Sequence, residues 1–171
     1  MTGGSSFDGI VNRLAFCLCS IALTNMLSYT LKTTVKRPRP KAVKGVKRHF
    51  NVRAKIAGGR SEFESFPSGD TAAGAAWGTT MAILTGIDAF YLVFIPVAFA
   101  RVYYHCHWIC DVLAGGLVGI VCPVILHFAS PEGWRSYTAA HILCGVFVYG
   151  GYMKAVAGGH YHHTTLRHSN D

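Results

Sequence analysis

Hydrophobic residues in this chain gather in five long runs separated by polar segments. The runs have 16 to 21 residues each and few charges, and they cover 14–31, 71–87, 89–104, 108–128 and 137–153. A helix needs about 20 apolar residues to cross the hydrocarbon core of a bilayer. Because backbone polar groups in lipid must pair within their own segment, we expect each run to be a helix. The pattern predicts an all-α, polytopic membrane bundle of about five transmembrane helices.

The composition agrees with this prediction. Charged residues make up 14% of the chain and hydrophobic residues 51%. A length of 171 residues suits one domain, so we expect a single unit that ends in a polar tail at 154–171. Small residues such as Gly115 and Gly119 would let neighbouring helices approach closely. A soluble helical bundle is the alternative interpretation of the same runs.

A basic segment, residues 32–65, separates the first two runs and carries most of the net charge of +8. Counting five spans places this segment on the same side as the 105–107 turn and the tail. The positive-inside tendency predicts that this side faces the cytoplasm or the mitochondrial matrix. Attraction to anionic membrane lipids is the simplest use of the charge, and few aromatic residues interleave it, so we expect no nucleic-acid partner. The N-terminal MTGGSSFD has no basic region, which predicts no cleaved signal peptide.

One cluster of cysteine, histidine and aspartate looks superficially like a metal site. Its members are Cys106, His107, Cys110 and Asp111. They are compressed into six residues, and no comparable loop supplies a second group of ligands. We therefore expect neither a metal ion nor another cofactor.

Three polar stretches lie at ends of the hydrophobic runs. They read KTTVKRPRP at 32–40, FPSGD at 66–70 and ARVYYHCHWICD at 100–111. The five-span topology brings all three to the basic side of the membrane. Ionisable residues at such a face are candidates for function by default.

The residue types in these stretches predict a phosphate site. Lys32, Arg39 and Arg101 offer positive charge and N–H donors that suit phosphate oxygens. Ser68 is placed to begin a helix, whose free backbone N–H groups attract anions. Gly69 permits close approach of the backbone to a ligand.

His107 and Asp111 predict the reactive group of the site. They are four residues apart, so on a helical turn both would project from one face and the carboxylate could orient the imidazole. An oriented imidazole beside a bound phosphate is a nucleophile. The chemistry that follows is phosphoryl transfer through a phosphohistidine, without a metal.

The same stretches resemble the motifs of the type 2 phosphatidic acid phosphatase and vanadium haloperoxidase superfamily. KTTVKRPRP matches its Lys-x6-Arg-Pro motif, FPSGD resembles Pro-Ser-Gly-His, and ARVYYHCHWICD resembles Ser-Arg-x5-His-x3-Asp. The resemblance covers roughly residues 14 to 130. It implies the helical core of that family and a membrane lipid phosphatase whose substrate is a phospholipid or an isoprenoid phosphate.

The resemblance also implies a role for each matching residue. Phosphate binding falls on Lys32, Arg39, Ser68, Gly69 and Arg101. His107 would attack phosphorus, and Asp111 would hold His107 in the reactive tautomer. Asp70 stands where the family has the histidine that protonates the leaving oxygen, so it is the candidate catalytic acid.

Three departures from the family pattern keep a second interpretation open. Ala100 replaces a serine, only one run precedes the first motif where the family usually has more, and Asp70 replaces the acid histidine. An ordinary aspartate is ionised at neutral pH and has no proton to give. Burial or a bound phosphate would favour its protonated form, whereas the neighbouring cations would oppose it. The alternative is a catalytically silent homologue that serves as a structural or lipid-binding subunit of a larger membrane complex with partner subunits.

Overall fold

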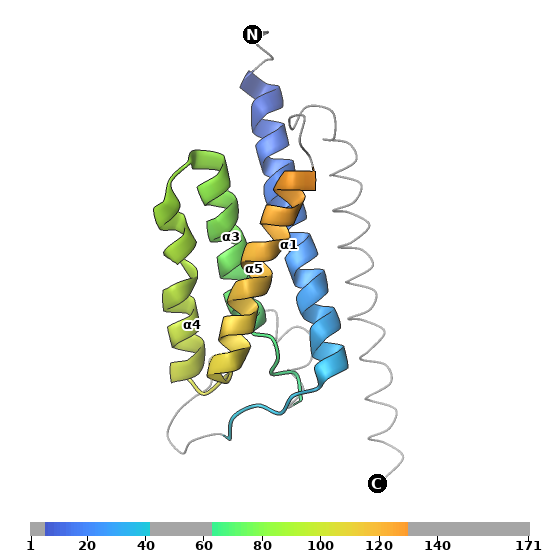
Figure 1. Cartoon of the computed structure of the whole chain (residues 1–171), viewed down its shortest axis with the longest axis vertical. Coiled ribbons are helices and arrows are strands. Elements are labelled where there is room, and N and C mark those ends of the chain that lie inside the picture. The colour runs from blue at the N-terminus through green and yellow to red at the C-terminus, as the bar shows by residue number, and fades with distance from the viewer. Residues whose placement is uncertain (1–5, 42–62, 130–171) are drawn as a thin grey trace.

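The structure, a computed structural model, describes residues 6–41 and 63–129, and within them every regular element is a helix (Figure 1). The elements are α1 Ser6–Val35, α3 Gly69–Thr85, the 3₁₀ helix η1 Asp88–Leu92, α4 Phe94–Tyr103 and α5 Ile109–Ala129. The all-helical prediction is confirmed for this part of the chain. The fifth run, 137–153, and the tail lie outside the described residues, so the number of spans stays a prediction.

Helix α3 lies at the centre of the bundle, where it packs against α5, α1 and α4. Two glycines of α5 allow the closest approach. A Cβ atom at Gly115 would collide with the carbonyl oxygen of Ser68, and one at Gly119 would collide with that of Ala72. The absence of side chains at these positions therefore allows the first half of α5 to pack directly against the start of α3.

Side chains are distributed in the manner expected of a bundle surrounded by lipid. Large apolar residues such as Leu18, Phe99 and Leu117 are exposed on the outside. Polar side chains such as Ser20 and Thr79 are buried between the helices. Soluble proteins seldom expose apolar patches of this extent, whereas small and polar residues are enriched at helix interfaces in membranes. This distribution favours the membrane bundle over the soluble one.

Two of the described helices are long and apolar enough to cross a membrane. These segments are Ile10–Val35 and Ile109–Ala129. The run at 71–87 forms the 17-residue helix α3. The single helix predicted over 89–104 is wrong, because the segment divides into η1 and the ten-residue α4. Pro96 explains the division, since its ring would clash with the carbonyl of Leu92 and it lacks an N–H, so an α-helix begins just before it.

Four helix ends meet at the lower end of the bundle in Figure 1: the last turns of α1 and α4 and the first turns of α3 and α5. Helix α1 stops where Lys36 adopts a left-handed conformation with φ of 46° and donates its N–H to the Lys32 carbonyl. His105, with φ of 49°, makes the turn between α4 and α5. This end of the bundle holds all of the polar stretches identified in the sequence.

Candidate active site

The start of α3 is built around Ser68. Its side chain is buried and caps the helix by accepting hydrogen bonds from the Thr71 backbone N–H at 3.5 Å and the Thr71 hydroxyl at 2.9 Å. The Ser68 N–H donates to the Asp111 carbonyl at 2.8 Å, which ties α3 to α5. Gly69 and Asp70 follow as the first, partly exposed residues of α3. The first N–H groups of an α-helix point away from its hydrogen-bonding ladder, which is why helix starts attract anions.

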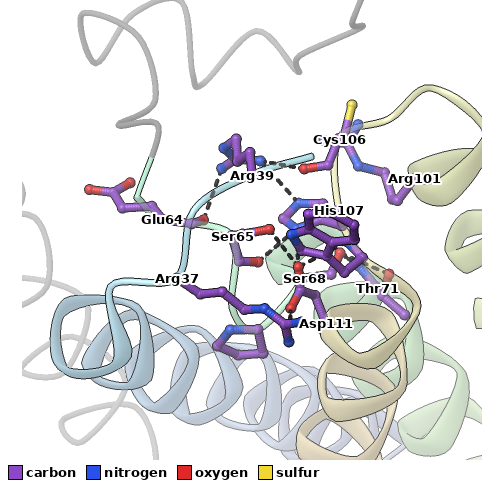
Figure 2. A network of polar contacts seen from close by, with 12 residues as sticks. Arg37, Arg39, Glu64, Ser65, Ser68, Thr71, Arg101, Cys106, His107 and Asp111 are labelled. Atoms are coloured by element: carbon purple, nitrogen blue, oxygen red, sulfur yellow. Dashed lines mark hydrogen bonds and ion pairs between the residues drawn. The ribbon is translucent and has the colours of Figure 1, made fainter. Parts of the chain in front are cut away.

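The imidazole of His107 is buried and held through its Nδ1 atom. Nδ1 lies 2.7 Å from the carbonyl oxygen of Ser65, which can only accept a hydrogen bond, so Nδ1 carries the proton (Figure 2). The other ring nitrogen, Nε2, then bears the lone pair. Nε2 lies 3.5 Å from Nη1 of Arg39. The geometry thus presents the nucleophilic nitrogen to a cation that can hold phosphate oxygens.

The carboxylate of Asp111 is fully buried and joins three segments of the chain. Its Oδ2 accepts from the Ser65 hydroxyl at 2.5 Å and from the Trp108 backbone N–H at 2.9 Å. Its Oδ1 lies 3.2 Å from Nη1 of Arg37. The contact to Trp108 satisfies the backbone N–H just before α5, as an acidic residue in the first helical turn often does.

Asp111 does not orient His107 in the direct way that the four-residue spacing predicts. The distance from His107 Nδ1 to Asp111 Oδ2 is 3.9 Å, which is too long for a hydrogen bond. The reason is that α5 begins at Ile109, so His107 precedes the helix. Asp111 acts instead through Ser65, whose hydroxyl it binds and whose carbonyl holds the imidazole.

Burial keeps His107 neutral. It lowers the pKa of His107 to about 4, an effect that the negative charge of Asp111 opposes and the positive charges of Arg39 and Lys32 reinforce. A neutral imidazole has a lone pair at physiological pH, which is the form that a nucleophile requires.

Two of the expected phosphate-binding cations, Lys32 and Arg39, converge on backbone carbonyl groups. Lys32 Nζ donates to the carbonyl of Pro67 and, at 3.3 Å, to that of Glu64. Arg39 donates from Nη2 to the Glu64 carbonyl at 2.9 Å and from Nη1 to the Cys106 carbonyl at 2.8 Å. These contacts hold both cations beside the start of α3 and beside His107.

The third expected cation, Arg101, forms an ion pair with Asp70. Its Nη2 lies 3.0 Å from Asp70 Oδ2, with 10% of the Arg101 side chain and 22% of the Asp70 side chain exposed. The sequence predicts separate roles for these residues, phosphate binding and proton donation. In the structure the two side chains contact each other.

Sequence reasoning missed two contributors, Ser65 and Arg37. Arg37 lies within the first motif, where only the lysine and the second arginine were assigned roles. In the structure it pairs with Asp111, and its guanidinium carbon lies 5.9 Å from the ring centre of Trp108. Ser65 contributes through both its hydroxyl and its carbonyl, and its position just before the Phe-Pro pair gives no signal of that.

In the part of the chain that the structure describes, no group of three or more His, Cys, Asp or Glu side chains is arranged to hold a metal ion. Cys106 is buried, whereas Cys110 is exposed on α5, so the two thiols of the apparent metal cluster do not face one centre. The site is therefore a cluster of cations around a neutral imidazole at a helix start, an arrangement suited to phosphoryl transfer.

Comparisons with known proteins identify the family of the chain. The PAP2 superfamily matches residues 13–135, a segment that contains all three motifs. No significant match was found among curated proteins or among solved structures. Because the matched segment is well over half of the chain and includes every residue of the candidate site, the chain belongs to the PAP2 superfamily.

Proposed function

We propose that this protein is a membrane phosphatase that hydrolyses phosphomonoesters or diphosphates of lipids through a phosphohistidine on His107. The observation that carries the proposal is the orientation of the imidazole. Nδ1 is fixed by the Ser65 carbonyl at 2.7 Å, and Nε2 faces Arg39 at 3.5 Å. A phosphate bound by Arg39 would lie next to the lone pair that attacks it.

The reaction has two steps. Nε2 of His107 forms a bond to phosphorus while the bond from phosphorus to the leaving oxygen breaks, and the leaving group departs with that electron pair. Water then attacks the phosphohistidine, the bond between nitrogen and phosphorus breaks, and inorganic phosphate leaves while Nε2 regains its lone pair. Dividing one difficult displacement into two easier ones is the general advantage of a covalent intermediate.

The surrounding residues stabilise charge in these steps. Lys32 and Arg39 lie beside the site and would neutralise the phosphoryl oxygens, and the first N–H groups of α3 would donate to the same oxygens. Arg101 would join them from the end of α4. The apolar outer surface of the bundle supports a lipid as the group that carries the phosphate.

The direct test is a trapping experiment on the purified full chain in detergent. A lipid phosphate labelled with ³²P at the transferred phosphorus is mixed with the protein and quenched within milliseconds. We expect an acid-labile, base-stable phosphoprotein together with steady release of phosphate. His107→Ala should abolish both signals, because Ala has no nucleophile.

His105→Asn is the matched control for this test. His105 is two residues away and has a positive φ, which Asn tolerates better than most residues. The control should retain both the label and phosphate release. Release of phosphate that persists in His107→Ala would contradict the proposed nucleophile.

A catalytically silent homologue is the second candidate, and the ion pair of Asp70 with Arg101 is the observation that favours it. In that case the pocket would serve as a structural or lipid-binding part of a membrane complex. Purification in mild detergent would then recover a stoichiometric partner, and wild-type protein would release no phosphate. Recovery of an active protein without partner subunits would exclude this candidate.

We also propose that the site faces the cytoplasm or the mitochondrial matrix. Five of the described cations, Lys32, Lys36, Arg37, Arg39 and Lys41, lie at the end of α1 and in the segment that follows it, whereas Arg13 lies near the start of α1. Lys41 is exposed, so Lys41→Cys offers a label at that face. In intact cells or organelles, a membrane-impermeant maleimide should label the introduced cysteine only after the membrane has been permeabilised.

A further inference from the structure

We propose that the site selects lipid diphosphates over lipid monophosphates, because the residue in the position of the catalytic acid is held as a carboxylate and cannot protonate a leaving oxygen. The inference rests on the proposed function. It names which of the two substrate classes the chemistry of this pocket favours.

The first support is the ion pair at Asp70. Its Oδ2 lies 3.0 Å from Nη2 of Arg101, and a guanidinium is charged at every physiological pH. An opposite charge at this distance favours the ionised form of a carboxyl group. The pair joins the first turn of α3 to the last turn of α4, so the backbone positions both partners before any substrate arrives.

The second support is the position of Asp70 in the first turn of α3. The N-terminal end of a helix carries partial positive charge, which stabilises a negative side chain there. Lys32 adds to this field, since its Cε atom lies 3.6 Å from where a Cβ of the adjacent Gly69 would be. The Asp70 side chain as a whole is 22% exposed, whereas its Oδ2 atom, which faces Arg101, is buried. The Arg101 pair, the helix start and Lys32 thus all favour the form of Asp70 that has no proton to donate.

The leaving group then decides the rate of the first step. In a lipid monophosphate the bond that breaks releases an alkoxide, whose parent alcohol is about as weak an acid as water. In a lipid diphosphate the same step transfers the terminal phosphoryl group to His107 and releases the lipid monophosphate. That product is stable as an anion, because the second pKa of a phosphate ester is about 6. Only the monophosphate therefore needs a proton from the protein.

This difference sets the size of the expected selectivity. A positioned general acid typically accelerates a reaction by about 10²–10⁴-fold. A site without one loses that factor on the monophosphate and keeps its rate on the diphosphate. We expect kcat/KM for the diphosphate to exceed that for the monophosphate of the same lipid by at least about 10²-fold.

The experiment measures both values for one lipid chain, as monophosphate and as diphosphate, with the purified full chain in detergent at pH 7. The selectivity ratio is kcat/KM for the diphosphate divided by kcat/KM for the monophosphate. Because both values come from the same preparation, the ratio does not depend on the fraction of each variant that is folded. Asp70→His introduces a group that can donate a proton near neutral pH. It should raise the rate on the monophosphate more than that on the diphosphate and lower the ratio by at least about tenfold.

Asp70→Asn is the complementary variant, because an amide has a similar shape and cannot act as an acid. If the wild-type carboxylate donates no proton, the ratio in Asp70→Asn should stay close to the wild-type ratio. If Asp70 does protonate the leaving oxygen, the amide should slow only the monophosphate and raise the ratio, which would overturn the inference.

The remaining outcomes separate the inference from the proposed function. Equal rates on both substrates, lost in His107→Ala, would overturn the selectivity and leave the phosphatase intact. Absence of phosphate release from both substrates, in wild type and in Asp70→His alike, would overturn the inference and the proposed function together. A diphosphate preference that falls in Asp70→His and is abolished with all activity in His107→Ala would support both.

Discussion

The site contains two carboxylates in the first turns of neighbouring helices, and their surroundings differ. Asp111, on α5, is fully buried and contacts the Ser65 hydroxyl, the Trp108 backbone and Arg37. Asp70, on α3, is partly exposed and forms an ion pair with Arg101. One carboxylate joins three segments of the chain, whereas the other joins two helix ends at the edge of the pocket.

The difference separates residues that stabilise the folded site from residues that affect mainly its chemistry. Removing Asp111 would leave buried donors without partners, a loss that surrounding structure cannot easily repair. Asp70 has a partly exposed side chain and its ion pair with Arg101 lies near the surface of the bundle, so solvent screens the pair and limits its contribution to stability. We therefore expect substitutions at Asp111 to affect folding and those at Asp70 to affect mainly chemistry.

The largest expected effect comes from Asp111→Ala. Loss of the carboxylate leaves the Ser65 hydroxyl and the Trp108 N–H without their acceptor and Arg37 without its counter-ion. We expect the free energy of unfolding to fall by about 4 kcal/mol and phosphatase activity to disappear. Thermal unfolding in detergent measures the loss, and Asp111→Asn, which keeps one acceptor oxygen, should lose less. An unchanged melting temperature in Asp111→Ala would contradict the proposed role.

The next effect is a dependence of stability on pH that originates at His107. The pKa of His107 is about 4 in the folded protein and about 6.5 in the unfolded chain, so between these values the unfolded state binds the additional proton. The contribution of His107 to the free energy of unfolding is therefore fully present above pH 6.5. It is lost as the pH is lowered toward 4, and the total loss is about 3 kcal/mol. Denaturant unfolding measured between pH 6.5 and 4 should show this decrease in the free energy of unfolding for wild type and a smaller decrease for His107→Gln.

A smaller effect is expected for Ser65→Ala. This change removes the hydroxyl that donates to Asp111 and retains the carbonyl that holds His107. A hydrogen bond to a charged group contributes about 2 kcal/mol, so the free energy of unfolding should fall by that amount. Thr33→Ala is the control, because Thr33 is exposed and its hydroxyl donates to the Tyr29 and Thr30 carbonyls within α1. Equal melting temperatures for the two variants would show that the contact of Ser65 with Asp111 contributes little.

The smallest effect on folding is expected for Asp70→Asn. Partly exposed ion pairs contribute about 1 kcal/mol or less, because solvent screens them. The melting temperature should therefore stay close to that of wild type, while the selectivity between diphosphate and monophosphate reports on the chemistry. A loss of stability as large as that of Asp111→Ala would remove the distinction between the two carboxylates.

The sequence predicted the helical class and the end of the bundle at which the motifs meet. It did so because apolar runs of sufficient length leave few alternatives to helices and because span counting fixes which ends share a face. The break before α4 was also encoded in the chain, at Pro96, but a count of apolar residues does not register it.

The contacts inside the site were harder to predict. The support of His107 by the Ser65 carbonyl depends on the path of the backbone between Ser65 and Ser68, which no side-chain pattern specifies. The pairing of Asp70 with Arg101 joins residues 31 positions apart in the numbering, and it depends on how α4 lies against α3. Motif spacing gives the residues of a site, whereas the partner of each charged group follows from packing.

The shortness of α3 and of the third hydrophobic run has a consequence for the kind of bilayer that suits the protein. Helix α3 is about 25 Å long, and η1 with α4 together also reach about 25 Å, whereas α5 reaches about 32 Å. An average hydrocarbon core is about 30 Å thick. The side of the bundle formed by α3, η1 and α4 is therefore shorter than an average membrane. Hydrophobic mismatch on this side would favour the thinner bilayers of a cell, or would thin the membrane locally beside the helix ends that carry the site.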